Sequence, residues 1–428
     1  MNHFEYRDQT LHCEGVPVPL IAAAVGTPFY LYSAATLTRH FQAMDQAFAD
    51  IPHVTCFAAK SCSNIAILNL FGRLGGGVDI VSGGELFRAL TAGIDPQKIV
   101  YSGVGKTTEE LRYALKSGIL MFNVESLQEL TTLQAVAADL RLVAPVALRI
   151  NPDVDPKTHA YISTGLAKNK FGLPLDQAGV IYAAAQAMTH IEVIGVSCHI
   201  GSQLTTVAPF VESINKVIAF VKHLAADGIA IKYLDMGGGL GIRYDQEEPP
   251  LPADYAAAMK EALLQVPGCT LIIEPGRVIV GNAGILVTKV LYTKSGTKHF
   301  IIVDAGMNDL ARPSLYGAHH DIKPVLASVQ SSSLSGEGRG HGEVVADLVG
   351  PICETGDFLA RDRSLPVCAT GDLLAVMSAG AYGFSMSSNY NSRPRVAEVL
   401  VRGDEFQVIR KRETLAALIQ GESIPEWE

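Results

Sequence analysis

Short apolar runs alternate with longer amphipathic stretches over residues 53–275, and this alternation predicts strands that each lead into a helix. A strand followed by a helix, repeated along the chain, is typical of a parallel sheet with helices packed on it. One further helix is predicted over residues 36–49, where apolar residues recur on a single face. The eight predicted strands are residues 53–59, 77–81, 98–102, 119–124, 145–151, 192–199, 231–237 and 270–275.

Three of these units carry the residues that begin a helix. A Ser or Thr followed three residues later by Glu is the capping box of helix N-termini, in which each side chain accepts a backbone N–H from the other residue. Glycine commonly follows the last turn of a helix, and Gly93 and Gly118 close the first two of these stretches. The predicted boxes are Ser82 with Glu85, Thr107 with Glu110, and Ser126 with Glu129.

The pattern changes after about residue 283. Runs such as ILVTKVLYT, HFIIVDAG and RVAEVLVRG are typical of strands, and glycines separate them. We therefore expect residues 1–32 to be N-terminal strands that join a β domain, 33–282 to form the domain with the alternating pattern, and 283–428 to form the β domain. The Ser- and Gly-rich segment 328–343 is predicted to be a flexible surface loop.

Composition limits the size, partners and compartment of the protein. The 428 residues exceed one ordinary domain, whereas a barrel of roughly 250 residues with a smaller domain accounts for them. The net charge is −9 and no long Lys/Arg run occurs, so we expect neither nucleic acid nor a membrane surface as a partner. The polar start, MNHFEYRDQT, lacks the apolar core of a signal peptide, and we expect no membrane span. Seven scattered cysteines without a CxxC pair indicate reduced thiols in the cytoplasm and no metal site.

Residues that carry chemistry fall where the predicted strands end. Lys60 ends the first run, His199 the sixth, the glycine string MGGGLG the seventh, and Glu274 with Arg277 the eighth. Eight parallel strands can form an open sheet or a closed barrel, and barrel active sites lie at the carboxyl ends of the strands. The placement of these residues therefore favours an α/β fold with a TIM-like (β/α)8 barrel, followed by a mainly β C-terminal domain.

Each of these residues also has a plain structural interpretation. Glycines let backbone N–H groups approach a phosphate, and barrels often bind phosphate after strands seven and eight, but the string also suits an ordinary turn. Lys60 is either a surface lysine or an amine that forms a Schiff base. Glu274 and Arg277 could form a structural ion pair, and His199 could be a packed histidine. Together, a phosphate site, a reactive lysine and a carboxylate for a pyridinium nitrogen describe pyridoxal phosphate.

An ordered set of motifs resembles the fold-type III pyridoxal-phosphate decarboxylases over nearly the whole chain. The resemblance implies a barrel followed by a β domain, pyridoxal 5′-phosphate as cofactor, and a homodimer whose active site is shared across the interface. The residues after Lys60 are Ser61 and Cys62, where many members have Ala and Asn, so this sequence departs from the family there. The motifs are FAAKSCSN (57–64), VDIVSGGE (78–85), NPDVDPKTHAYISTGLAKNKFG (151–172), CHIGSQ (198–203), GGGLG (237–241), EPGR (274–277), DAGMNDLARPSLYGA (304–318), GPICETGD (350–357) and GAYGFSMSSNYN (380–391).

The resemblance also implies roles for individual residues. Lys60 would carry the cofactor, Glu274 would keep the pyridine nitrogen protonated, and His199 would stack on the ring. Cys353 and Glu354 would come from the neighbouring subunit, with Cys353 protonating the carbon that CO2 leaves. The predicted catalytic residues are Lys60, His199 and Cys353. The predicted cofactor contacts are Lys60, His199, Ser202, Gly237, Gly238, Gly239, Glu274, Gly276, Arg277 and Tyr382, and the predicted substrate contacts are Arg277, Arg312, Tyr316, Glu354 and Tyr382.

The predicted substrate contacts bear on specificity. By residue type alone, Cys353 could be a buried cysteine, Arg312 could lie in a solvated loop and Tyr382 could serve packing. Taken with the ordered motifs, Glu354 and an arginine, Arg312 or Arg277, offer opposite charges that match a small amino acid ending in an ammonium and a carboxylate. The expected reaction is therefore decarboxylation of meso-2,6-diaminopimelate to L-lysine and CO2.

Three other functions stay open. A polyamine-pathway decarboxylase acts on ornithine or arginine, whose cationic tail calls for acidic residues without an added arginine. An amino-acid racemase needs a second base that faces the lysine, and no motif marks one. A non-catalytic regulatory relative that binds pyridoxal phosphate tends to lose catalytic residues, yet Lys60, Glu274 and Cys353 are all present.

Overall fold

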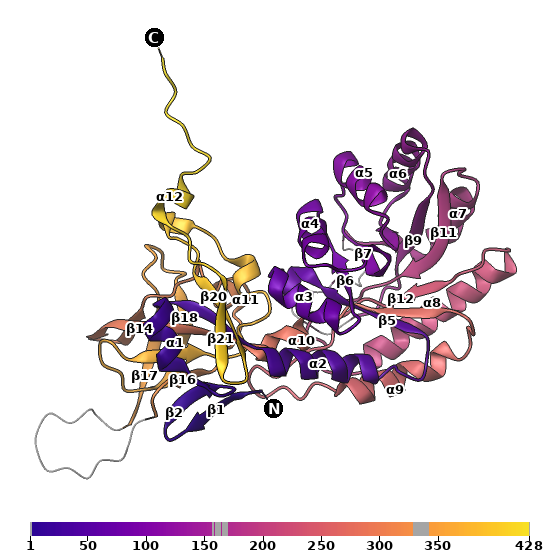
Figure 1. Cartoon of the computed structure of the whole chain (residues 1–428). Helices are drawn as coiled ribbons and strands as arrows, with labels where there is room; N and C mark the ends of the chain where they lie inside the picture. The colour runs from indigo at the N-terminus through magenta and orange to yellow at the C-terminus, as the bar shows by residue number, and fades with distance from the viewer. Residues whose placement is uncertain (1, 156–157, 159–163, 165–169, 328–341, 428) are drawn as a thin grey trace, which may run out of the picture. The chain divides into compact units, whose positions relative to one another are not determined.

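The computed structural model forms two compact units (Figure 1). We call Thr38–Ile279 the barrel unit, and Met1–Leu37 together with Val280–Glu428 the β unit. Most of the predicted loop 328–343 and part of the motif 151–172 lie outside the described residues. The structure describes residues 2–155, 158, 164, 170–327 and 342–427.

The barrel unit is built on a closed ring of eight parallel strands. Each strand pairs with the next, and β13 pairs with β5 to close the ring. The eight predicted strands and the predicted parallel barrel are therefore confirmed. The ring strands are β5 (His53–Ala58), β6 (Gly77–Ile80), β7 (Ile99–Tyr101), β8 (Met121–Val124), β9 (Ala144–Asn151), β11 (Ile191–Ser197), β12 (Tyr233–Asp235) and β13 (Thr270–Ile273), and the short β10 (Leu173–Pro174) also pairs with β9.

Helices pack outside the ring, as Figure 1 shows for α3 to α6. Every residue of β6, β7 and β8 is buried, which is expected of parallel strands that are covered on both faces. The helix predicted over 36–49 is α2, which begins and ends slightly earlier. The helices are α2 (Ala34–Gln46), α3 (Ile65–Arg73), α4 (Gly83–Thr91), α5 (Thr108–Ser117), α6 (Leu127–Leu140), α7 (Leu175–Gln186), α8 (Ala208–Ala226), α9 (Pro252–Leu263) and α10 (Arg277–Val280).

One of the three predicted capping boxes is complete. Thr107 and Glu110 satisfy each other's backbone N–H groups, and Gly118 ends that helix in the left-handed conformation with φ 65°. Ser82 and Ser126 cap their helices as predicted, but each following glutamate accepts the N–H of the residue before the cap. Both serines are almost fully extended, with φ −158°, whereas Thr107 has φ −78°. The reciprocal half of the box was therefore wrong for these two.

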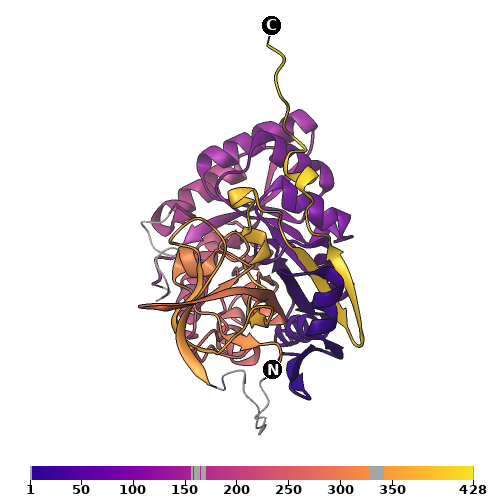
Figure 2. The same ribbon diagram turned by 90° about the vertical axis from the view of Figure 1, so that its left-hand side faces the viewer.

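The β unit holds a sheet in the order β18-β17-β15-β14-β4-β20-β21. β4 comes from the N-terminal segment, and it lies between β14, antiparallel to it, and β20, parallel to it. Figure 2 shows this unit from the side. Its strands are β4 (Phe29–Ser33), β14 (Gly284–Ser295), β15 (His299–Val303), β16 (Ile322–Pro324), β17 (Glu343–Val349), β18 (Phe358–Pro366), β19 (Leu373–Val376), β20 (Ala397–Arg402) and β21 (Glu405–Arg410).

Smaller elements complete the β unit. A core of apolar residues from the first segment, such as Val18 and Ile21, packs with residues of β4, β14 and β20. The elements are β1 (Phe4–Arg7), β2 (Thr10–Cys13), β3 (Val16–Pro17), α1 (Val18–Val25), α11 (Arg312–Tyr316) and α12 (Leu415–Leu418).

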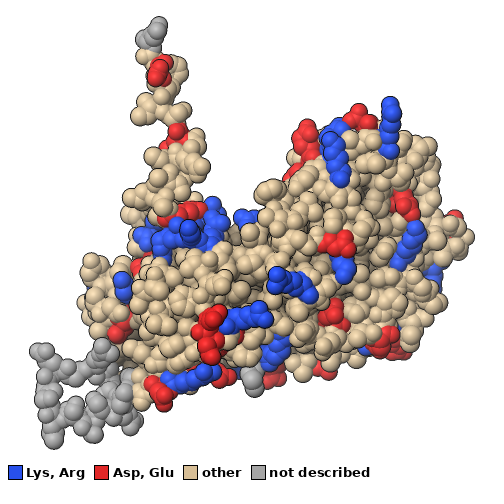
Figure 3. All heavy atoms as spheres, viewed as in Figure 1, with Lys and Arg blue, Asp and Glu red and all other residues tan. Residues whose placement is uncertain are grey.

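Charged side chains of both signs are interspersed on the face of the barrel unit seen in Figure 3. That face therefore offers no broad field of one sign that would attract a polyanion. Among the described helices, none has the length and apolar character needed to cross a membrane.

Candidate active site

Four predicted site residues directly follow strands of the ring. Lys60 comes two residues after β5, His199 two after β11, Gly237 two after β12 and Glu274 one after β13. Because all eight strands are parallel, their carboxyl ends lie at one end of the ring. The structure therefore brings these four predicted residues to the same rim of the barrel unit.

Lys60 faces a buried carboxylate at that rim. Its Nζ lies 2.6 Å from Oδ2 of Asp79, which is completely buried in β6. The lysine side chain itself is 34% exposed, so its amine is within reach of a small molecule. Oδ1 of Asp79 is buried and accepts no hydrogen bond from the described residues. The rim thus holds an accessible amine beside a carboxylate with unused acceptor capacity.

A pair of carboxyl groups lies at the same end of the ring. Asp235 and Glu274 are both buried, and their carboxyl groups are hydrogen-bonded to each other. Asp235 also accepts from the backbone N–H of Gly237 at 2.9 Å and from Nδ2 of Asn123 at 2.6 Å. Ser102 makes a long contact of 3.4 Å to Glu274. Asp235 therefore has more donors than Glu274.

This arrangement decides which carboxyl group holds a proton. Burial raises the pKa of Glu274 well above its usual range, and the nearby charges of Asp235 and Asp79 raise it further. Burial also raises the pKa of Asp235, but its three hydrogen bonds oppose that shift. Two carboxyl groups that share a hydrogen bond cannot readily both ionise. Glu274 is therefore the protonated member and Asp235 the ionised one.

His199 is neutral in this environment. Burial, followed by the charges of Arg149 and Lys60, lowers the pKa of His199 well below its usual range. Its Nδ1 accepts the backbone N–H of Gly238 at 3.3 Å, so the proton of the neutral ring is on Nε2. The imidazole can consequently present a flat, uncharged face to a ligand.

The glycine string is required by close approach of three loops. A Cβ on Gly238 would lie 2.1 Å from the carbonyl oxygen of Glu274, and one on Gly239 would lie 2.4 Å from that of Gly201. Gly237 and Gly239 also have φ of +65° and +116°, which side chains disfavour. Glycine is thus needed here for the turn itself, and any contact of these backbone groups with phosphate is an additional role.

Ser202, Gly276 and Arg277 lie next to this string. Arg277, which is buried, donates to Oγ of Ser202 at 3.0 Å and to the hydroxyl of Tyr244 at 2.7 Å. A Cβ on Gly276 would lie 3.0 Å from Oγ of Ser61, the residue after Lys60. A guanidinium held by two hydroxyl groups beside glycine loops is a suitable anion site.

The other predicted site residues belong to the β unit. Arg312 and Tyr316 begin and end α11, and the buried Arg312 lies with its Nη1 3.0 Å from Nε2 of His320. Cys353 is exposed, and its backbone N–H donates to Oδ1 of Asn391 at 3.0 Å. Arg312 is therefore not part of a solvated loop, and Cys353 is not a buried cysteine, although residue type alone allowed both.

Glu354 and Tyr382 each have a distinctive local setting. The hydroxyl of Tyr390 is hydrogen-bonded to the carboxylate of Glu354, and this contact is the main cause of the raised pKa of Tyr390. Tyr382 has φ +55°, a left-handed conformation that is costly for a bulky side chain. Such strain is concentrated at functional sites.

Sequence reasoning missed the polar residues inside the ring strands. Asp79, Asn123 and Asp235 each lie within a short strand whose other residues are nearly all apolar and buried. A polar residue is costly at such a position unless it is bonded, so its presence near a strand's carboxyl end was an available signal. Tyr244, which holds Arg277, lies in an irregular segment and had no such signal.

The barrel residues suit a cofactor with an aldehyde, a basic ring nitrogen and an anionic group. Lys60 offers an amine for the aldehyde, and Glu274 offers a proton for the nitrogen. Arg277 and the glycine loops suit the anion. Among the described residues, no group of three or more His, Cys, Asp or Glu side chains is placed to hold a metal ion.

Comparisons with known proteins agree with this chemistry. The family described as "Pyridoxal-dependent decarboxylase, pyridoxal binding domain" matches residues 34–281. The chain is 53% identical over 425 residues to the diaminopimelate decarboxylase of Pseudomonas aeruginosa, covering 99% of both chains. It is 50% identical to that of Haemophilus influenzae, covering 98% of both.

A solved structure has the same fold. The crystal structure of diaminopimelate decarboxylase from Helicobacter pylori complexed with L-lysine matches with a TM-score of 0.88 and 43% identity, covering 94% of this chain and 98% of that one. The matched family covers more than half of the chain, and the relatives cover nearly all of it. The chain therefore belongs to the pyridoxal-dependent decarboxylase family.

Proposed function

We propose that this chain decarboxylates meso-2,6-diaminopimelate to L-lysine and CO2, the reaction of a carboxy-lyase (EC 4.1.1.20) that ends lysine biosynthesis. Relatives with about half of their residues identical over their full length bear the name of this activity. The observation that carries the proposal is the contact of the Lys60 amine with the buried Asp79, at a rim that also holds Glu274.

The residues at the rim fit pyridoxal 5′-phosphate. When bound, this cofactor supplies an electron sink for the electron pair that CO2 leaves behind. Lys60 provides the amine to which its aldehyde attaches. Asp79 Oδ1 and Asn123 Oδ1 are buried acceptors with no donor among the described residues, as expected of a site completed by a ligand.

The carboxyl pair holds the proton that the ring nitrogen needs. Glu274 is protonated because Asp235 carries the charge of the pair. It can therefore donate its proton to a basic nitrogen, and the two carboxyl groups then stabilise the resulting cation. His199 is neutral, so it packs on an aromatic ring without a competing positive charge. Ser202, Arg277 and the string Gly237–Gly239, with Gly276, are our proposed phosphate contacts.

The β unit supplies the remaining proposed residues. Cys353 would return a proton to the substrate carbon, and Glu354 with Arg312 would bind the far ammonium and carboxylate groups. Tyr316 and Tyr382 complete the proposed substrate contacts. We further propose a cytoplasmic homodimer in which Cys353 and Glu354 serve the neighbouring subunit, and the domain limits 1–32, 33–282 and 283–428.

The test is a substrate screen with product identification. The protein loaded with pyridoxal phosphate should release CO2 and lysine from meso-diaminopimelate, and it should absorb visible light. Lys60→Ala should abolish both, because the amine that holds the aldehyde is gone. Lys232→Ala is the matched control, since the side chain of that lysine forms an exposed ion pair with Glu192. Turnover of ornithine or arginine alone would contradict the proposed substrate.

A further inference from the structure

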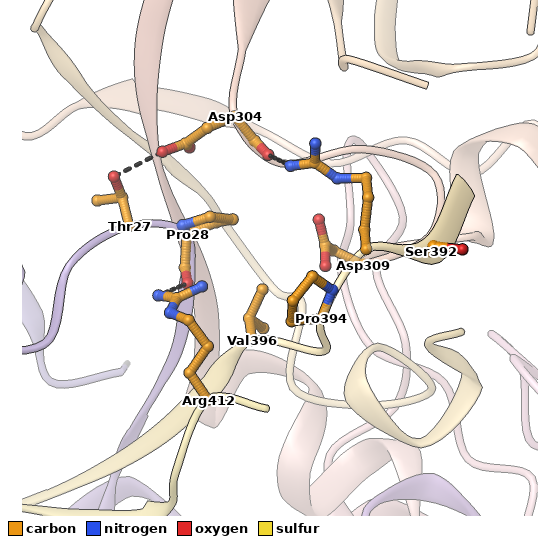
Figure 4. Close-up of a pocket in the computed structure, with 9 residues that line it drawn as sticks. Thr27, Pro28, Asp304, Asp309, Ser392, Pro394, Val396 and Arg412 are labelled. Carbon is orange, nitrogen blue, oxygen red and sulfur yellow. Dashed lines mark hydrogen bonds between the residues drawn. The ribbon is translucent and has the colours of Figure 1, made fainter. Parts of the chain in front are cut away.

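A separate cavity of about 370 Å³ lies wholly within the β unit (Figure 4). Figure 4 shows Arg412 beside Pro28 on one side and Asp309 with Pro394 on the other, with Val396 between them. Asp304 lies above, where it accepts a hydrogen bond from Thr27. The volume falls in the range of small-molecule sites, and none of the lining residues has a role in the proposed reaction.

Four charged groups of both signs line this cavity without pairing. Asp304, Asp309, Arg393 and Arg412 form no ion pair within 4.0 Å among the described residues. Buried charges are normally paired because an unpaired one loses its hydration without compensation. Here burial lowers the pKa of Arg412 and raises that of Asp309 to about 6, and the opposite charges that line the cavity reduce both shifts without cancelling them.

The bonding capacity that remains has a definite pattern. Asp304 accepts three hydrogen bonds, from Thr27, Thr288 and the backbone of Lys289. Asp309 accepts two, from the backbone of Gly306 and from Nδ2 of Asn308, and a carboxylate can accept about four. Within the described part of the chain, Arg393 and Arg412 each donate from Nη2 alone, to backbone carbonyl groups. Two guanidinium groups with donors to spare therefore line one cavity together with two carboxylates, of which Asp309 has the greater acceptor capacity left.

We propose that this cavity binds a free α-amino acid in its zwitterionic form. The carboxylate of the ligand would accept from Arg393 and Arg412, and its ammonium group would donate to Asp309. A simple anion would meet an uncompensated carboxylate, and a simple cation would meet two guanidinium groups. A zwitterion satisfies both signs at once.

The lining is connected to the segment that holds Cys353. Ser392 lines the cavity, and both it and Asn391 have left-handed φ angles, of 54° and 55°. Two consecutive residues in this conformation store backbone strain. Asn391 accepts the N–H of Cys353, and the preceding Tyr390 is bonded to Glu354. A ligand that shifts Ser392 would therefore change the position of Cys353, a consequence for catalysis that rests on the proposed function.

Binding is tested on the cofactor-loaded protein by equilibrium dialysis with labelled L-alanine. We expect saturable binding of one molecule per chain, with acetate and methylammonium competing poorly. Asp309→Asn and Arg412→Gln should each weaken binding by about tenfold or more, since each removes a charged hydrogen-bond partner. Asp404→Asn and Arg402→Gln remove exposed charges of the same unit and should leave binding unchanged.

Lys60→Ala separates this cavity from the barrel site. Binding of L-alanine should survive in Lys60→Ala, where the cofactor is no longer anchored. Binding that is lost in Lys60→Ala but kept in Asp309→Asn would overturn the proposal, as would no binding in the wild type. Neither result bears on whether the protein decarboxylates diaminopimelate, which the substrate screen decides separately.

The connection to Cys353 has its own readout. L-Alanine should change the rate at which iodoacetamide alkylates Cys353, measured by mass spectrometry of the peptide, and Asp309→Asn should abolish that change. Cys368, a partly buried cysteine of the same unit, is the internal reference. An alkylation rate that is unaffected despite saturable binding would refute the connection while leaving the binding site in place.

Discussion

Two buried charge clusters in the barrel unit are built in opposite ways. The first joins one amine, Lys60, to three carboxyl groups, those of Asp79, Asp235 and Glu274. The second is the pair of Arg149 and Glu125, which lie 2.8 Å apart and are both less than a tenth exposed. The first cluster has excess acid and an acceptor that receives no hydrogen bond from the described residues, whereas the second has one charge of each sign.

The difference lies in how completely each cluster satisfies itself. One carboxylate oxygen of Glu125 accepts from Arg149 and the other from the N–H of Gly172, while the guanidinium of Arg149 stacks on Phe171. Such a pair is costly to break because either charge would be left buried alone. The hydrogen-bonding groups of the acid cluster do not satisfy one another in this way. We infer that its residues are placed to bind a ligand, at some cost in folding stability.

The largest effect on folding stability is expected from breaking the pair of Arg149 and Glu125. Arg149→Met should lower the free energy of unfolding by about 3–5 kcal/mol, because it leaves the Glu125 carboxylate buried without its partner. Urea unfolding at neutral pH measures the loss. Lys232→Met breaks an exposed pair and should cost less than about 1 kcal/mol. Equal losses in the two variants would show that burial does not distinguish these pairs.

A substitution in the acid cluster should lower catalytic activity and leave folding stability intact. Glu274→Gln should lower kcat by about 10²–10³-fold, since the proton for the ring nitrogen is lost. Its stability should not fall at pH 8: the raised pKa of Glu274 means that the folded state resists ionisation, and Gln removes that penalty. Steady-state kinetics and urea unfolding measure the two effects. A Glu274→Gln variant that is less stable and fully active would contradict the view that the acid cluster serves a ligand and not folding.

A smaller, pH-dependent effect is expected at Glu85, a neighbour of the acid cluster. Burial and the charge of Asp79 raise the pKa of Glu85 to about 7 from the ordinary 4.5. Between these two pH values the unfolded chain binds fewer protons than the folded one, so stability falls as pH rises. Glu85→Gln should remove about 2–3 kcal/mol of that fall between pH 5 and pH 8.

The control for this prediction is another glutamate on a helix of the barrel unit. Glu261→Gln changes an exposed carboxyl group on α9 and should leave the pH dependence of unfolding as it is in the wild type. A wild-type stability that rises steadily from pH 5 to pH 8, and is unaltered by Glu85→Gln, would show that Glu85 is not held in its neutral form.

The local pattern of the chain predicted the ring well. Strands that are buried on both faces are short apolar runs, and helix starts are marked by capping residues, so both signals are contained in a few neighbouring residues. The roles of Asp79 and Asp235 could not be predicted in this way, because their partners come from other parts of the chain. Asp79 accepts from Lys60 and Asp235 accepts from Asn123. The ends of the predicted strands pointed to Lys60 and Glu274 and the resemblance gave them roles, but the carboxyl pair emerged only when the strands were assembled.

The β unit was harder to predict in detail for a related reason. β4 pairs with β14 and β20, and nothing in the sequence FYLYS specifies partners that lie so far along the chain. The cavity beside Asp309 is likewise assembled from distant segments. Nothing in the sequence marks its charged residues as a group, since they come together only in the folded unit.

The central position of β4 has a consequence for biosynthesis. All five residues of this strand are buried between β14 and β20, yet it leaves the ribosome before every residue of those partners. At translation rates of roughly 5–20 residues per second, β4 waits on the order of 10–50 seconds for β14 to begin to emerge. Throughout that interval the strand lacks both of its partner strands and can pack only on the N-terminal segment that precedes it, so chaperone binding to the nascent chain is expected to concentrate on residues 29–33.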